Sequence, residues 1–74
     1  MATPSPNDRY YELVLEKIND DRYPSGELMD RLELALRSRE QLELYLNVLL
    51  DKVEQDSYPS KQMLDRIREL GALL

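Results

Sequence analysis

The sequence predicts an all-α protein, a four-helix bundle made of two tandem helical hairpins. Three observations support this fold class. The chain repeats its own pattern after about 35 residues, its apolar residues recur at the spacing of an amphipathic helix, and no segment alternates apolar and polar residues as a strand does. We expect a flexible N-terminal tail in residues 1–5 and a single four-helix domain in residues 6–74. Within it, the repeat units cover about residues 6–38 and 39–74.

The repeat is clearest at two turns. The motif Tyr-Pro-Ser at residues 23–25 recurs at residues 58–60, and charged and apolar positions on both sides also correspond. A proline disfavours the helical conformation in the residue before it, so each tyrosine is expected to end a helix. The serine after the proline can then cap the next helix. Each turn therefore joins two neighbouring helices that run antiparallel.

Four serines are expected to start the helices, because a serine side chain accepts a hydrogen bond from a backbone N–H of the first helical turn. These N-cap residues are Ser5, Ser25, Ser38 and Ser60. Pro6 suits the first helical position after its cap, and Gln41 completes a capping box with Ser38. The expected helices run from residue 6 to about 21, between the caps at 25 and 38, from 39 to about 56, and from 61 onward.

One face of each expected helix is apolar and should point into the core. On the third helix this face forms an arc of about 140°. The inward residues are Tyr11, Val14, Leu15 and Ile18 in the first helix, Leu28, Leu32, Ala35 and Leu36 in the second, Leu42, Tyr45, Leu46, Leu49, Leu50 and Val53 in the third, and Met63, Ile67, Leu70 and Leu74 in the fourth.

Composition narrows the classes of function. The 74 residues include no Cys and no His, so disulfides and the usual zinc ligands are missing, and we expect no metal and no cofactor. Fifteen Asp and Glu against ten Lys and Arg give a net charge of −5, which repels phosphate backbones and disfavours nucleic acid as a partner. The start lacks the features of a signal peptide, and no apolar run approaches the ~18 residues of a membrane span. We therefore expect a cytoplasmic protein with no membrane partner.

An enzymatic function is not expected, and no catalytic residue is assigned. The chain has no glycine-rich phosphate loop and no nucleophile motif. Carboxylates alone can perform acid–base chemistry in a cleft, but so small a set of helices leaves little room for a substrate pocket. The acidic pairs near residues 20–21 and 54–56 lack the ligand pattern of a calcium loop.

An excess of apolar residues points instead to protein–protein contact. Several apolar side chains fall outside the inward faces, and a patch of such residues marks an interaction site. The candidate interaction residues are Leu13, Leu34, Leu44, Val48, Leu73 and Leu74, with Tyr23 and Tyr58 as secondary candidates. We expect a small acidic interaction module that forms a homodimer, the commonest closed assembly.

Two other functions stay open at this point. A regulatory adaptor, of an anti-sigma-like or antitoxin-like kind, would use the same apolar surface on a different protein. A nucleic-acid-associated protein would need a local basic face, to which only a few arginines around the first hairpin could contribute. These are Arg22, Arg31, Arg37 and Arg39.

Overall fold

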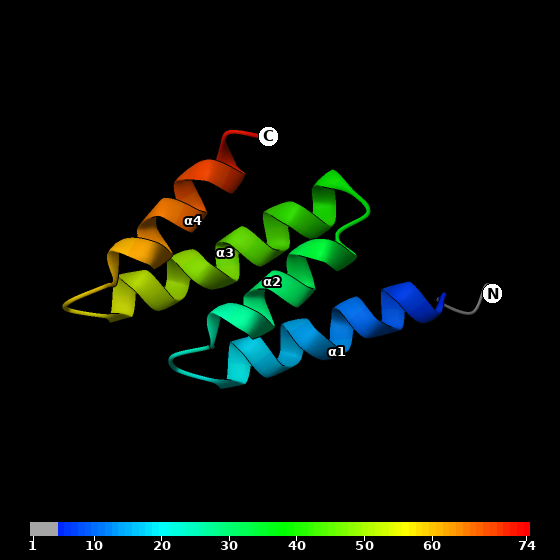
Figure 1. Cartoon of the computed structure of the whole chain (residues 1–74), viewed down its shortest axis with the longest axis horizontal. Helices are drawn as coiled ribbons and strands as arrows, with labels where there is room; N and C mark the ends of the chain where they lie inside the picture. Colours follow the sequence, from blue (N-terminus) through cyan, green and yellow to red (C-terminus); the bar gives the residue numbers. More distant parts are fainter. Residues whose placement is uncertain (1–4) are drawn as a thin grey trace. The chain divides into compact units, whose positions relative to one another are not determined.

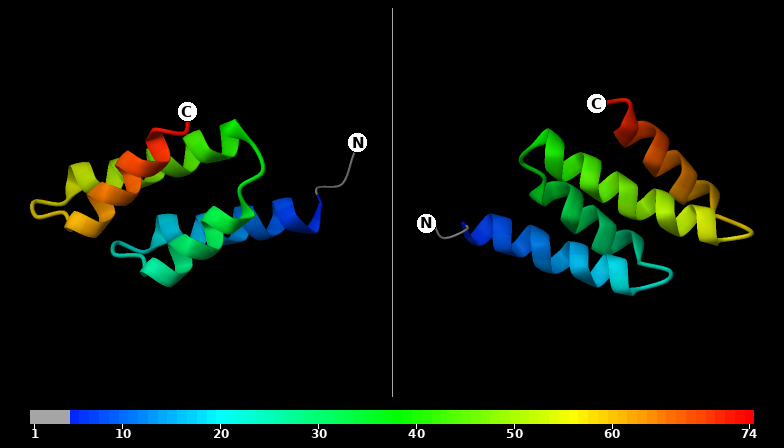
Figure 2. Two further views of the ribbon diagram at one scale, coloured as in Figure 1. Left: turned by 45° about the horizontal axis from the view of Figure 1, so that its top comes forward. Right: turned by 180° about the vertical axis from the view of Figure 1, so that it is seen from behind.

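The structure, a computed structural model, describes residues 5–74, so that the expected tail, apart from Ser5, lies outside the described residues. All regular structure in this range is helical (Figure 1). The four helices are α1 (Pro6–Asp20), α2 (Gly26–Ala35), α3 (Arg39–Gln55) and α4 (Lys61–Gly71). Helix α1 packs against α2, and α3 packs against α4 (Figures 1 and 2). The predicted all-α fold of two helical hairpins is therefore confirmed.

The chain divides into two compact units between Arg37 and Ser38. We call residues 5–37 hairpin 1 and residues 38–74 hairpin 2. Each hairpin consists of a longer helix, a short turn that contains the Tyr-Pro-Ser motif, and a shorter helix that returns along the first.

Each helix begins at the serine that the sequence predicts. In all four caps the serine Oγ accepts a hydrogen bond of 3.1 Å from the backbone N–H three residues later. The donors are the N–H groups of Asp8, Leu28, Gln41 and Met63. These bonds satisfy backbone donors that have no partner inside the helix, so the four starts are set locally by the sequence.

In both turns an aspartate side chain accepts the same kind of backbone hydrogen bond. The Oδ1 atom of Asp21 accepts a hydrogen bond of 3.0 Å from the backbone N–H of Tyr23, and Asp56 does the same for Tyr58. Both aspartates have extended backbones, with ψ of 123° and 124°. Because they leave the helical conformation to hold the turn, α1 and α3 end one residue earlier than expected.

The buried core residues of the helices belong to α1, α2 and α3, and each of these helices buries mainly its predicted face. These core residues are Tyr11, Val14, Ile18, Met29, Leu32, Ala35, Leu42, Tyr45, Leu46 and Leu49. Helix α4 has no buried residue at all. Its expected inward residues Met63, Ile67 and Leu70 are only half-buried, and Leu74 is exposed.

The placement of Leu50 in the core was wrong, because 41% of this residue is exposed. Leu50 and Tyr45 lie at the two edges of the apolar arc of α3. The structure buries the edge that holds Tyr45 and leaves the edge that holds Leu50 open to solvent. The apolar arc of α3 is therefore wider than the surface that the chain covers.

A polar contact closes the open end of hairpin 1. The side-chain Nδ2 of Asn7, at the start of α1, donates a hydrogen bond of 3.1 Å to the carbonyl oxygen of Ala35, at the end of α2. The guanidinium of Arg37 donates a longer one of 3.4 Å to the Oδ1 of Asn7. These bonds join the two ends of the chain segment that forms hairpin 1.

Candidate functional site

Helix α4 is the most strongly amphipathic of the four helices, yet its apolar face is the least covered. Leu64 is 45% exposed, and Ile67 is half-buried. Apolar surface that stays in contact with water costs about 25 cal/mol for each Å² relative to burial. A further contact that covered the open face of α4 would therefore be favourable.

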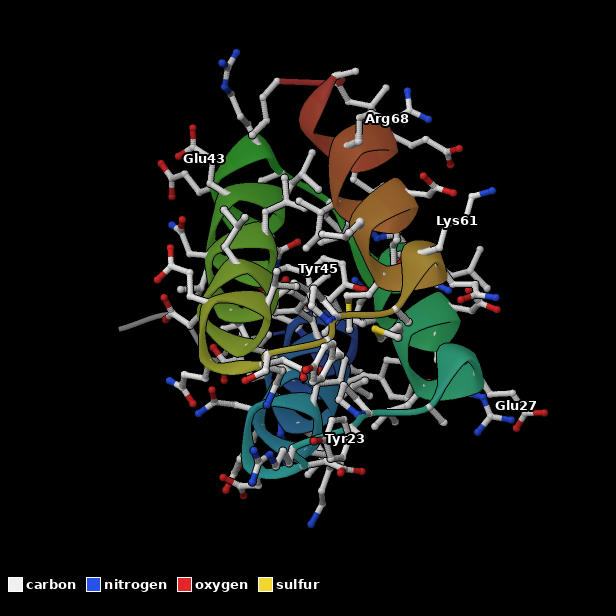
Figure 3. The ribbon with its side chains drawn as sticks, turned by 90° about the vertical axis from the view of Figure 1, so that its left-hand side faces the viewer. Tyr23, Glu27, Glu43, Tyr45, Lys61 and Arg68 are labelled. Atoms are coloured by element: carbon white, nitrogen blue, oxygen red, sulfur yellow. The ribbon has the colours of Figure 1, made fainter. Side chains whose placement is uncertain are left out.

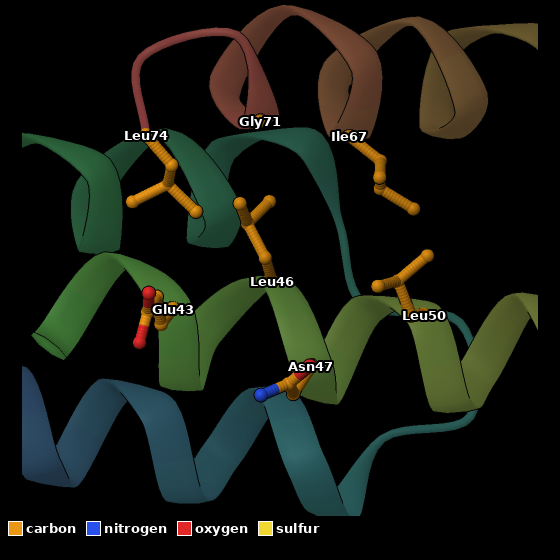
Figure 4. A pocket seen from close by; sticks show the side chains of 7 residues that line it. All are labelled: Glu43, Leu46, Asn47, Leu50, Ile67, Gly71 and Leu74. Atoms are coloured by element: carbon orange, nitrogen blue, oxygen red, sulfur yellow. The ribbon is translucent and has the colours of Figure 1, made fainter. Parts of the chain in front are cut away.

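A groove runs between α3 and α4 on one side of hairpin 2 (Figure 4). Its volume is about 360 Å³. The lining residues are Glu43, Leu46, Asn47, Leu50, Ile67, Gly71 and Leu74. Ile67 and Leu74 point from the α4 side toward Leu50 and Leu46 of α3, so four apolar side chains form the floor (Figure 4). The two polar side chains stand on the α3 edge.

Gly71 leaves part of this groove empty. A Cβ atom added at this glycine would meet no atom within 4 Å, so the space beside it is open. The equivalent residue in the repeat is Leu36, which carries a full side chain and is half-buried. Hairpin 2 therefore has open space for an apolar side chain of another molecule at the position where hairpin 1 carries a leucine.

The two edges of the groove carry opposite charges. On α3, Glu43 and Glu54 lie on the groove side, roughly 60° and 80° around the helix from Leu46. On α4, Arg68 and Lys61 lie on the groove side, roughly 100° and 120° from Ile67. We call the first pair the acidic rim and the second pair the basic rim.

All four rim residues are exposed. Figure 3 shows Glu43 on the outer side of α3, with Arg68 and Lys61 on the opposite, outer side of α4. Glu43 also forms an ion pair with Arg39, one helical turn earlier, at 3.8 Å. Arg39 partly neutralises the charge of Glu43, so Glu54 contributes more of the negative charge on the acidic rim.

The candidate residues from the sequence lie in several places. Leu13, Leu34, Leu44, Leu73, Leu74, Tyr23 and Tyr58 are exposed, and Val48 is half-buried. Of these eight, only Leu74 lines the groove. Leu44 and Val48 share the side of α3 that faces away from the groove.

The groove residues that sequence reasoning missed are Leu46, Leu50 and Ile67, which it assigned to the core. A signal for them was present in the repeat. Gly71 replaces a leucine, and the two basic-rim residues replace Gly26 and Glu33 of the first unit. These departures from the repeat all lie along one side of α4.

This side of hairpin 2 is mainly apolar. Apolar side chains form its floor, and no buried side-chain polar atom in residues 5–74 lacks a hydrogen-bond partner. In the same described range, no three acidic side chains converge as a metal site requires. None of the described helices combines the length and the apolar composition that crossing a membrane requires. A comparison of the chain with protein-family models, curated proteins and solved structures found no match.

Proposed function

We propose that this chain is a small non-enzymatic protein–protein interaction module that associates with itself through the groove of hairpin 2. The observation that carries the proposal is that α4, although strongly amphipathic, has no buried residue. Exposed apolar surface of this kind marks an interaction site. A partner that covered the groove would bury the floor residues Leu50, Ile67 and Leu74.

The size of the chain favours a second copy as that partner. A chain of 74 residues buries a smaller share of its surface than larger domains do, about 60%, so its core is marginal. Small proteins compensate with disulfides, metals or a second subunit. The sequence has no Cys to form disulfides, and it has neither Cys nor His to form the usual metal sites. A second subunit is most often added by pairing about a two-fold axis.

Two substitutions on opposite sides of α3 test this proposal. Leu50→Glu places a carboxylate on the groove floor, and Leu44→Glu makes the same change on the far side of the same helix. The two leucines are similarly exposed, 41% and 52%, so Leu44→Glu is a matched control. Sedimentation equilibrium of both variants and the wild type over roughly 1 μM to 1 mM covers the range of modest affinities.

We expect a wild-type dimer, a Leu44→Glu variant that stays dimeric, and a Leu50→Glu variant whose dimer is more than about 100-fold weaker, because a buried unpaired carboxylate costs several kcal/mol. Far-UV circular dichroism checks that both variants stay helical. A wild type that is monomeric at every concentration contradicts self-association. A dimer that Leu44→Glu breaks and Leu50→Glu spares moves the interface to the side of Leu44 and Val48.

A further inference from the structure

The charged rims distinguish the groove of hairpin 2 from the corresponding side of hairpin 1. The two basic-rim residues, Lys61 and Arg68, stand where the first repeat unit has Gly26 and Glu33. Helix α2 therefore carries no cation at either of these positions. The side of hairpin 1 that corresponds to the groove therefore lacks the two cations that form the basic rim of hairpin 2.

A groove with an apolar floor, one acidic edge and one basic edge is complementary to itself. Two grooves can face each other about a two-fold axis in either of two directions. An axis across the groove places each rim on the same rim of the partner, so that like charges meet and repel. An axis along the groove exchanges the edges and places each acidic rim on a basic rim. Charge complementarity of this kind selects the orientation of a complex.

We infer that two copies of this chain pair groove to groove about a two-fold axis that runs along the groove. Helix α3 of each copy then lies antiparallel to α4 of the partner. The inference rests on the proposed self-association and adds the identity of the partner surface, which is the same groove of the second copy. It also assigns the rims the role of selecting this orientation.

The apolar floor fits the same arrangement. In this orientation the leucines of α3 in one copy face the apolar residues of α4 in the other. The open space beside Gly71 then receives an apolar side chain from α3 of the partner. The rims stay at the edges of the contact, where charges tune orientation and association rate more than they add affinity.

Charge reversal on the rims tests the orientation. One variant reverses the basic rim (Lys61→Glu with Arg68→Glu), a second reverses the acidic rim (Glu43→Lys with Glu54→Lys), and a third combines all four substitutions. In the first two, both rims have one sign, so we expect dimers that are about 10- to 100-fold weaker. The combined variant has its rims exchanged, and we expect affinity within about threefold of the wild type.

Net charge alone makes the opposite prediction for one variant. Reversing two charges changes the net charge by four, from −5 to −9 when the basic rim is reversed and to −1 when the acidic rim is reversed. General repulsion would therefore make the second variant associate more tightly than the wild type. The rim pairing predicts weaker association for both. The combined variant keeps the net charge of −5, so it controls for this effect.

Sedimentation equilibrium at low and high salt measures these affinities, with circular dichroism as a check on helicity. Recovery in the combined variant excludes misfolding as the cause of the losses. Two reversed variants that dimerise as the wild type does, or a combined variant that does not recover, overturn the orientation. If Leu50→Glu still breaks the dimer in that case, the proposed function stands and only this inference fails. A wild type that is monomeric at every concentration contradicts both the proposed self-association and this orientation.

Discussion

The two hairpins share one sequence pattern but differ in how they bury the second helix. At one pair of equivalent positions Met29 is 6% exposed and Leu64 is 45% exposed. At the next pair Leu32 is completely buried, whereas Ile67 is half-buried. The pattern of apolar residues in a repeat therefore does not determine by itself how much of each face is covered.

The ends of the hairpins differ as well. Hairpin 1 is closed by Asn7, whose amide bonds to Ala35. The equivalent of Asn7 in hairpin 2 is Leu42, an apolar residue that cannot make this bond. The repeat thus keeps the caps and turns that set the backbone, while the second unit lacks the asparagine of this closure and has an open groove. Hairpin 1 therefore has a polar contact that joins its two ends, whereas hairpin 2 has an open apolar groove.

The largest effect that separates the two hairpins is expected from truncating equivalent residues on α2 and α4. Leu32→Ala removes a completely buried side chain and should cost about 2–5 kcal/mol of unfolding free energy. Ile67→Ala removes a half-buried one and should cost about 1 kcal/mol at low protein concentration. Urea denaturation monitored by circular dichroism measures both values.

Protein concentration sharpens this comparison. If a second copy covers the groove, the cost of Ile67→Ala rises with protein concentration, whereas the cost of Leu32→Ala does not, because binding to the folded state adds to stability by mass action. Equal costs for the two variants at low concentration would show that the difference in burial has no energetic consequence.

A smaller and symmetric effect is expected at the caps. Ser25 and Ser60 occupy equivalent positions and make the same hydrogen bond of 3.1 Å to the backbone. Replacing either one with Ala should therefore cost about 1 kcal/mol of unfolding free energy. Denaturation of the two variants under identical conditions tests the equality. Costs that differ by more than a factor of about two would mean that the repeat does not preserve the local energetics of the turns.

These caps explain why the fold could be predicted from the sequence. A serine cap, a proline and an aspartate turn act within a few residues, so their effect can be inferred without knowledge of the rest of the molecule. The helix ends moved by only one residue because of the aspartate side chains at Asp21 and Asp56. The helical hairpins follow from these local signals and from the apolar periodicity.

The groove could not be predicted in the same way. Leu46, Leu50 and Ile67 have the spacing of core residues, and the sequence does not reveal which edge of a wide apolar arc the chain covers. Exposed leucines such as Leu44 are recognisable because they lie off the main face. Leu50 lies on the main face and is still 41% exposed, so only the structure identifies it.

The smallest expected effect concerns Tyr11, which is buried on α1, where the repeat places Leu46 in hairpin 2. Burial raises the pKa of Tyr11 above its usual value of about 10, and the carboxylate of Glu12 raises it further. Hairpin 1 therefore carries at this core position an ionisable group that hairpin 2 lacks. Below about pH 9 the phenol keeps its proton in both the folded and the unfolded chain, so it adds no pH dependence.

Above about pH 10 the unfolded chain loses the Tyr11 proton first, because the folded state holds it with a higher pKa. The unfolding free energy should then fall with rising pH until the folded phenol also ionises. Tyr11→Phe removes this contribution. The difference between wild type and variant, measured by denaturation from about pH 8 to 11.5, should be constant below pH 9 and should then decrease. Other titrating groups cancel in this difference, and a lost hydroxyl contact shifts it by a constant. A difference that stays constant across the whole range would show that Tyr11 ionises equally easily in both states, and that this substitution in the repeat carries no electrostatic cost.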